Sequence, residues 1–400
     1  MRAFINIKRI FVFLYVMVII ALLLVPSLKY DFKYAQVFML SLPLLVFAFI
    51  EGKTFRKALL INAVLLFITF MSYYVINVRG NLGQAQGLLV TMYLFALPYL
   101  ICQYLVDIKD TVLMKWICIA TCAILAYIMI VTFREYAYDP TISRKLASSV
   151  VDDYIIAQIK KNIGGFGFCY CLGMFAPYLT SVIGRAKGKQ KMFAVGCLFV
   201  ILVFSVFSQY TTLILLSVIS IFYVILTQGK MSAKKVITLV LFITLAVSFR
   251  SMVWFLANNV SLSALSHHFY SLYYILGGEE DFGRWSLYKA NIMLFLRNPI
   301  FGANLTIHYN EWLVDHSHST FFGKLSGGGI IGFGGFVGFI ASVWHYLCNR
   351  SGMRHLIPVF VVYILLSILN PVTPEISITA FLIIPLIEYQ FINKEEQLYV

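Results

Sequence analysis

Side chains that could carry acid–base chemistry gather in one segment of an otherwise apolar chain. Five of the seven histidines lie between residues 267 and 318, and the last two, His316 and His318, lie within three residues of Asp315. A neutral imidazole titrates near neutral pH and accepts a proton from a substrate hydroxyl. The pair, with Asp315 or His308, could instead hold a metal ion, but the chain has no HExxH motif and no supporting cysteine spacing. The pattern therefore favours a histidine base without a metal.

Basic side chains occur in the same part of the chain and in one earlier polar loop. Arg284 opens an amphipathic stretch, and its planar guanidinium suits bidentate binding of a phosphate or pyrophosphate group. The alternative is an interfacial arginine that reaches lipid headgroups. We expect Asp315 and His316 to contribute to substrate binding. Five further basic residues are expected to do the same: Lys289, Arg297, Arg144, Lys160 and Lys161.

The composition places these side chains in a membrane protein. Hydrophobic residues make up 61% of the 400 residues and charged residues only 12%, about half the share of an ordinary soluble domain. The apolar runs are long enough to cross a bilayer as helices, which takes roughly 20 residues each. We predict an all-α, polytopic protein that forms one transmembrane domain over 1–400, with spans near 10–28, 34–50, 58–76, 85–106, 112–133, 164–183, 192–208, 210–228, 236–255, 320–347, 356–370 and 376–391.

The distribution of lysine and arginine predicts the orientation of these spans. With both termini in the cytoplasm, 18 of the 31 basic residues fall in cytoplasmic segments, as the positive-inside rule requires. Ten others lie in or beside two long outer loops, 134–163 and 256–319, where they do not serve orientation. We expect them to attract an anionic ligand at the outer face, so the net charge of +14 needs no nucleic-acid partner.

Secondary structure in and after the second loop can also be predicted. The stretch 282–296 places Trp285, Tyr288, Ile292 and Phe295 on one face, which is typical of an interfacial helix. The spacing Gly334-xxx-Gly338 predicts close helix packing in the following span. Glu375 and Glu388 lie near the ends of the last span and receive no functional role.

The order of these features resembles the bacterial O-antigen polymerase and O-antigen ligase superfamily. Its members combine many spans with a long outer loop that holds an early arginine, then an Asn-Pro-Ile-Phe-Gly segment (here 298–302) and a histidine before a glycine-rich helix. The ligase branch carries His-[Asn/Ser/Gln]-x9-Gly-x-x-Gly, which His318, Ser319, Gly329 and Gly332 match. This register selects His318 over His316. The resemblance is sharpest over 205–339.

The resemblance implies a fold similar to type C glycosyltransferases and a metal-independent, inverting glycosyl transfer without a cofactor. The donor would be an oligosaccharide on undecaprenyl pyrophosphate, with His318 as general base and Arg284 as pyrophosphate contact. The two long outer loops favour a polymerase of surface polysaccharide in the inner membrane, with its active site on the periplasmic side and a chain-length regulator as a possible partner. An O-antigen ligase that passes polymer to the lipid A core is the alternative. A lipid flippase or transporter is a second alternative from a different class.

Overall fold

The computed structural model describes residues 2–32, 34–77, 82–147, 152–227, 237, 240, 244, 248, 251–260, 266, 269–270, 273, 283–303, 308–309, 312–313 and 319–398. This part of the chain is almost entirely helical. Eight of its helices are long and apolar enough to cross a membrane, and three shorter apolar helices accompany them. The prediction of a multi-pass, all-α membrane protein is therefore confirmed. The predicted number of twelve spans is not, and most of the span near 236–255 lies outside the described residues.

Most helices that precede the second long loop follow the predicted apolar runs, whereas α7 and α8 lie in the predicted first long loop. They are α1 (Arg2–Leu24), α2 (Pro26–Asp31), α3 (Tyr34–Glu51), α4 (Lys53–Asn77), α5 (Leu82–Ile108), α6 (Thr111–Tyr136), α7 (Ile142–Lys145), α8 (Asp153–Lys160), α9 (Phe166–Gly173), α10 (Phe175–Arg185), α11 (Gly188–Phe207) and α12 (Thr211–Thr227). Two aspartates begin helices as N-caps: Asp110 accepts a 3.1 Å hydrogen bond from Leu113 N, and Asp152 a 2.8 Å bond from Ile155 N.

The remaining elements begin with α15 (Gly283–Arg297) and a small antiparallel hairpin of β1 (His308–Tyr309) and β2 (Trp312–Leu313). They continue with α16 (Thr320–Trp344), η2 (His345–Arg350), η3 (Arg354–Leu356), α17 (Ile357–Leu369), α18 (Pro374–Ile378), η4 (Thr379–Ile383) and α19 (Ile384–Leu398). The central core lies between α5, α9, α17 and α18–α19, where the fully buried side chains include Tyr99, Tyr104, Tyr170, Tyr363 and Phe381.

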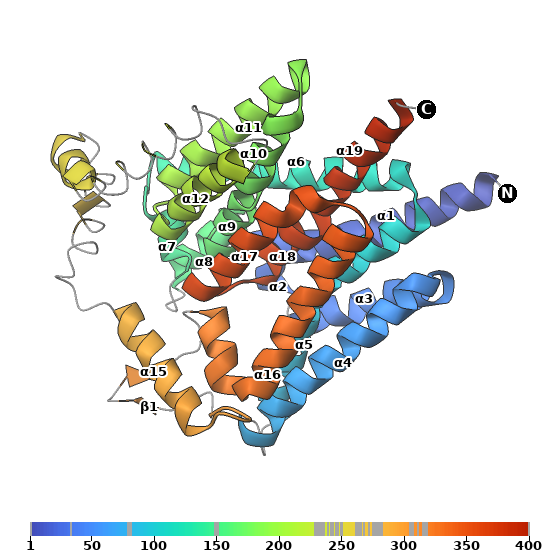
Figure 1. Cartoon of the computed structure of the whole chain (residues 1–400), viewed down its shortest axis with the longest axis horizontal. Coiled ribbons are helices and arrows are strands. Elements are labelled where there is room, and N and C mark those ends of the chain that lie inside the picture. Colours follow the sequence, from blue (N-terminus) through green and yellow to red (C-terminus); the bar gives the residue numbers. More distant parts are fainter. Residues whose placement is uncertain are drawn as a thin grey trace.

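Polar contacts join segments that the sequence predicts on the same side of the membrane. Lys8 forms a 2.7 Å ion pair with Glu51, which also accepts a 2.9 Å hydrogen bond from Tyr104, and Arg9 pairs with Asp110 at 2.5 Å. All of these residues lie at predicted cytoplasmic ends. Figure 1 shows both chain termini on the right and α7, α8 and α15 on the left. The grouping of segments into two ends therefore agrees with the alternation of the apolar runs.

Helix α16 is broken, which the uninterrupted prediction for 320–347 missed. Gly329 has φ 59° and ψ −164°, and Figure 1 shows two helical pieces that meet at a bend. The turn that follows α15 fits into the break, because Pro299 O accepts a 2.8 Å hydrogen bond from Ile330 N and Ile300 O a 3.3 Å bond from Ile331 N. A Cβ on Gly329 would lie 2.4 Å from Ile300 O, so only glycine is compatible with this conformation.

The close packing that the glycine pattern predicted is present at Gly338 but not at Gly334, and Gly335 also takes part in it. Gly335 and Gly338 face α4, where an added Cβ would lie 2.1 Å from Thr69 Oγ1 and 2.9 Å from Leu65 Cδ2 respectively. A Cβ added to Gly334 would meet no atom of another described residue within 4 Å, so its predicted packing role was wrong. Gly335 and Gly338 thus let α16 approach α4 closely.

Helix α15 matches the predicted stretch 282–296 in length, and it buries only part of the predicted apolar face against the protein. Tyr288, Asn291 and Leu294 are buried, whereas Ile292, which was predicted on the apolar face, is 40% exposed. The buried face packs on α16, where Asn291 Oδ1 accepts a hydrogen bond of 2.5 Å from Ser326 Oγ. A pattern of apolar residues does not reveal a polar contact of this kind, so it did not indicate the burial of Asn291.

Candidate functional site: a polar pocket where helix ends converge

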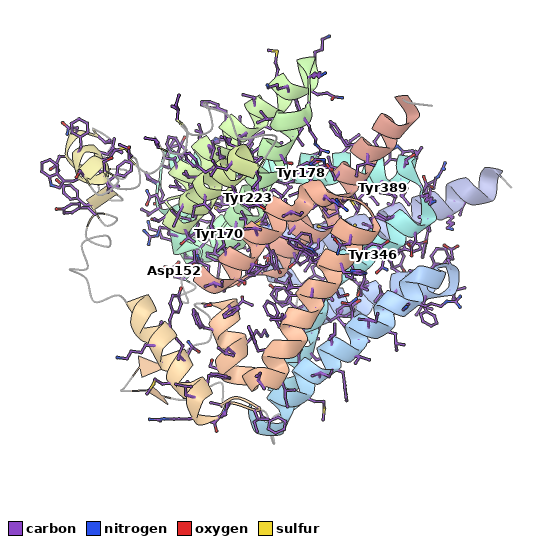
Figure 2. The ribbon with its side chains drawn as sticks, viewed as in Figure 1. Asp152, Tyr170, Tyr178, Tyr223, Tyr346 and Tyr389 are labelled. Carbon is purple, nitrogen blue, oxygen red and sulfur yellow. The ribbon has the colours of Figure 1, made fainter. Side chains whose placement is uncertain are left out.

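The turn between α17 and α18 is a meeting point for helices α9, α15 and α16. Leu369 O accepts a 2.8 Å hydrogen bond from the hydroxyl of Tyr288 on α15. Thr320, the first residue of α16, donates from its backbone N to Asn370 O at 3.3 Å and accepts at Oγ1 from Val372 N at 2.7 Å. Asn370 Nδ2 also lies 3.3 Å from the hydroxyl of Tyr170 on α9 (Figure 2). Segments distant in sequence are therefore fixed against one turn.

Ser319, the residue after His318 in the sequence, is held firmly at this place. It is 3% exposed and caps α16, because its Oγ accepts a 3.1 Å hydrogen bond from Phe322 N. The same hydroxyl donates to Ser367 O of α17 at 3.1 Å. Phe322 in turn stacks on the ring of Tyr288 with centroids 5.0 Å apart. The start of α16 is thus tied to both α15 and α17.

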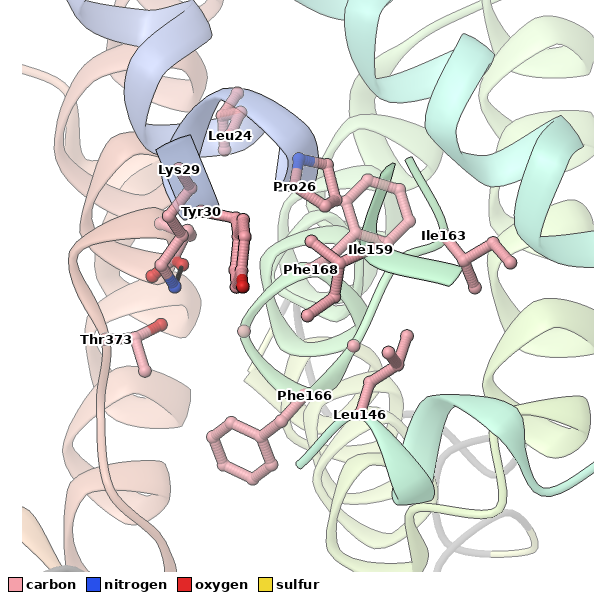
Figure 3. Close-up of a pocket in the computed structure, with 13 residues that line it drawn as sticks. Leu24, Pro26, Lys29, Tyr30, Leu146, Ile159, Ile163, Phe166, Phe168 and Thr373 are labelled. Atoms are coloured by element: carbon pink, nitrogen blue, oxygen red, sulfur yellow. Dashed lines mark hydrogen bonds and ion pairs between the residues drawn. The ribbon is translucent and has the colours of Figure 1, made fainter. Parts of the chain in front are cut away.

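The same turn continues into a cavity of about 460 Å³, which we call the α2–α18 pocket (Figure 3). Thr373 and Glu375 line it from the N-terminus of α18, and Lys29 and Tyr30 line it from α2. The apolar side is made by the first long loop and the start of α9: Leu146, Ile159, Ile163, Phe166 and Phe168. Its size falls within the roughly 300–1,000 Å³ of small-molecule sites.

An ion pair between Lys29 and Glu375 forms the polar wall of the pocket. Burial alone lowers the pKa of the Lys29 ammonium, but the Glu375 carboxylate more than reverses this, so the pKa lies above its ordinary 10.5. The Nζ atom also lies 5.8 Å from the centroid of the Tyr34 ring. Lys29 is therefore a fixed positive charge beside a carboxylate, not a proton donor or acceptor at neutral pH.

Two oxygens on this wall are buried without a hydrogen-bond partner within the part of the chain that the structure describes: Glu375 Oε2 and Thr373 Oγ1. Glu375 is only 4% exposed. Gly167 makes the close approach of α9 possible, because a Cβ there would lie 2.9 Å from Thr373 Oγ1 and 3.1 Å from Glu375 Cδ. Buried polar atoms are almost always satisfied in proteins, and these two belong to residues that line one cavity, which makes the pocket a functional candidate.

The predicted cations of the first long loop lie beside this pocket in the chain. Arg144, Lys160 and Lys161 are exposed and adjoin its lining residues in sequence. Tyr210 joins the first long loop to the helix bundle. Its hydroxyl donates a 2.7 Å hydrogen bond to Ser143 O in the loop, and the centroid of its ring lies 5.5 Å from that of Phe166 at the start of α9.

The predicted residues of the second loop are only partly described. Lys289 and Arg297 are exposed on α15. Arg284 lies in the first turn of α15, and its side chain is outside the described part of the chain. His318, His316 and Asp315 fall outside the described residues altogether, so their predicted roles stay predictions.

Lys29, Thr373 and Glu375 are functional candidates that the sequence interpretation missed. Lys29 is one of only three basic residues in the short predicted outer loops, and Glu375 is an acidic residue at the start of an apolar span. Ionisable residues inside or at the edge of a span carry a desolvation cost and are often functional. Applied to Glu375, that rule would have found it.

No model of a known protein family matches the chain, and no curated protein matches it. What the fold and the site define is therefore a class: a multi-pass membrane protein with a polar pocket at one end of its helix bundle.

Proposed function

We propose that this protein polymerises oligosaccharide repeat units carried on undecaprenyl pyrophosphate, at the outer face of the plasma membrane. The observation that supports this best is the packing of the start of α16 against α17 and the α17–α18 turn. Ser319, the residue after His318, donates to Ser367 O, and Thr320 N donates to Asn370 O. The family resemblance places the catalytic histidine at His318. Asn370, which Thr320 contacts, lies three residues before Thr373 of the pocket, and this short separation in the chain supports the proposal.

In the proposed reaction the neutral imidazole of His318 takes the proton from an acceptor sugar hydroxyl. The hydroxyl oxygen then forms a bond to the anomeric carbon of the donor, and the carbon–oxygen bond to pyrophosphate breaks with its electron pair remaining on the phosphate. General-base assistance of this kind contributes about 10²- to 10⁴-fold to a rate. The charge that develops on the leaving group is stabilised by Arg284, with Lys289 and the first-loop cations as further positive charge.

A second cavity offers room for the lipid part of such a substrate. It has a volume of about 380 Å³ and lies between α16 and α17, where its lining is almost wholly apolar and Ser367 is the main polar residue. Phe321, Ile340 and Trp344 are among the lining residues. An apolar groove that begins beside the Ser319–Ser367 hydrogen bond suits an isoprenoid chain, because burial of apolar surface favours its binding.

Deletion of the gene in its host tests the proposal and separates it from the alternatives. For a polymerase we expect surface glycolipid capped with a single repeat unit, visible as one band on a gel in place of a ladder. Polymer that accumulates on undecaprenyl pyrophosphate would indicate a ligase instead. Single repeat units trapped on the cytoplasmic side would indicate a flippase. An unchanged ladder would contradict all three.

A further inference from the structure

We infer that the α2–α18 pocket binds an uncharged, hydroxyl-rich sugar residue through hydrogen bonds to Glu375 Oε2 and Thr373 Oγ1. This inference deepens the proposed function, because in that setting the sugar is the acceptor end of a lipid-linked repeat unit. The evidence for a carbohydrate comes from the pocket itself and has three parts: its unpartnered oxygens, its charge balance and its walls.

The unpartnered oxygens call for a ligand that donates hydrogen bonds. A carboxylate oxygen only accepts, and a threonine hydroxyl both accepts and donates, so the pair matches neighbouring hydroxyl groups. Thr373 is the N-cap residue of α18, yet its side chain makes no capping hydrogen bond. Helix capping therefore does not account for the threonine hydroxyl, which remains available to a bound molecule.

The charge balance of the pocket favours a neutral ligand. Lys29 and Glu375 form an ion pair, so the two charges that line the cavity cancel. An anionic ligand would have to compete with Glu375 for Lys29, and a cationic one with Lys29 for Glu375. Because Lys29 pairs with Oε1, the other carboxylate oxygen, Oε2, stays available as a charged acceptor, and charged acceptors form stronger hydrogen bonds with hydroxyl groups.

The walls of the pocket fit the apolar faces of a sugar ring. Phe166 and Phe168 come from α9, Tyr30 comes from α2, and aliphatic side chains of the first long loop complete the lining (Figure 3). Tyr30 is 45% exposed and stands at the rim. A site with one polar wall and one aromatic wall matches a molecule with hydroxyl groups on its edge and C–H groups on its faces.

Binding of free sugars by the purified full-length protein tests this inference without any need for catalysis. We would measure saturation-transfer NMR in detergent with a panel of uncharged disaccharides that contain hexoses and N-acetylhexosamines. The variants are Thr373→Val, which keeps the shape of the side chain, and Glu375→Gln, which keeps its volume. Glu51→Gln is the matched control, because Glu51 also forms an ion pair with a lysine and accepts a hydrogen bond from a tyrosine, but lies at the other end of the bundle.

We expect at least one disaccharide to bind the wild type and the Glu51→Gln variant equally. Thr373→Val removes a hydrogen-bonding hydroxyl, and Glu375→Gln replaces a charged acceptor with a neutral amide. Each change should raise the Kd of that disaccharide about 10-fold or more. No binding to the wild type, or unchanged binding in a folded Thr373→Val variant, would overturn the inference. If sugar binds but His318→Ala still polymerises, the proposed catalytic assignment fails while the sugar pocket stands.

Discussion

The two carboxylate oxygens of Glu375 have different surroundings. Oε1 pairs with Lys29, whereas Oε2 is buried on the wall of the α2–α18 pocket without a partner among the described residues. Glu388, the other buried glutamate of the last span, uses both oxygens: Arg185 Nη1 donates to Oε1 at 2.8 Å, and Tyr178 donates to Oε2 at 3.1 Å. Glu388 is therefore a structural carboxylate, whereas Glu375 keeps one oxygen, Oε2, available as an acceptor among the described residues.

Removal of Lys29 alone should destabilise the protein more than removal of the whole pair. Lys29→Met leaves a buried carboxylate without its counter-ion, at a cost of about 1–3 kcal/mol after allowance for the partial exposure of Lys29. Lys29→Met combined with Glu375→Gln should recover most of that loss, measured as the thermal midpoint in detergent. Equal loss in the single and double variants would show that the ion pair does not stabilise the fold.

The pH dependence of this effect follows from the raised pKa of Lys29. A group whose pKa is raised on folding gives its full stabilisation below its ordinary pKa of 10.5 and loses it as the pH rises through the higher folded value. The difference in thermal midpoint between wild type and Lys29→Met should therefore be constant from about pH 6 to 9. A decline within that range would contradict the charge state assigned here.

Arg284→Lys should lower polymer elongation about 10-fold or more. One ammonium cannot reproduce the two parallel hydrogen bonds that a guanidinium makes to a pyrophosphate. Arg354→Lys is the control, because Arg354 is exposed in η3 at the predicted cytoplasmic end. Full activity of Arg284→Lys in the same assay would favour the alternative role, an arginine that only reaches lipid headgroups.

At the scale of elements, two sequence motifs of the family resemblance contact each other at the break in α16: the 298–302 segment and the glycines that follow His318. The 298–302 turn supplies carbonyl groups to Ile330 N and Ile331 N, which the break deprives of helical partners. Gly302 has φ 83°, and a Cβ there would lie 2.3 Å from Gly327 O. The Asn-Pro-Ile-Phe-Gly segment and the glycines after His318 thus form one packed unit that sets the direction of α16.

Gly329→Ala should disrupt this unit, whereas Gly334→Ala should not. At Gly329 the alanine would need a left-handed conformation and would clash with Ile300 O, which costs about 1–3 kcal/mol or more. At Gly334 the backbone is helical and the new Cβ would meet no atom of another described residue within 4 Å, so the change should be neutral or stabilise by about 0.5–1 kcal/mol. Thermal midpoints and folded yields would decide, and equal behaviour of the two variants would refute the break.

The sequence predicted the elements well and their contacts poorly. Long apolar runs predicted the helices because the hydrophobic length of a bilayer limits them directly. The pattern could not reveal the Lys29–Glu375 pair, since its members are 346 residues apart and no local rule links them. It also missed the helix break at Gly329, because that depends on a preceding turn, 298–302, that becomes adjacent only in the folded protein.

On the scale of the whole molecule, the two ends of the bundle differ in what their polar residues do. At the predicted cytoplasmic end, Glu51, Asp110 and Glu388 all pair with basic side chains. At the other end, the α2–α18 pocket retains unpartnered acceptors among the described residues, and the first long loop presents exposed cations beside it in the chain. Exposed positive charge beside the pocket in the chain suits an anionic substrate.

Cysteine labelling tests this sidedness. Tyr138, which is 75% exposed in the first long loop, and Lys189, which is exposed at the start of α11, should face opposite sides of the membrane. We expect a membrane-impermeant maleimide to label Tyr138→Cys in intact cells, and Lys189→Cys only after permeabilisation. Labelling is scored against the wild type, whose described cysteines are mostly buried. The reverse pattern would place the pocket on the cytoplasmic side and exclude the proposed function.

The most direct test of the central claim is glycan elongation by the purified protein in detergent, where no sealed compartment exists and transport cannot contribute. Lipid-linked repeat units from the host serve as both donor and acceptor, and the products are resolved as a ladder. We predict a ladder from the wild type and none from His318→Ala, with both proteins showing the same elution profile on gel filtration. A ladder of normal length from His318→Ala, or no elongation by the wild type, would contradict the account.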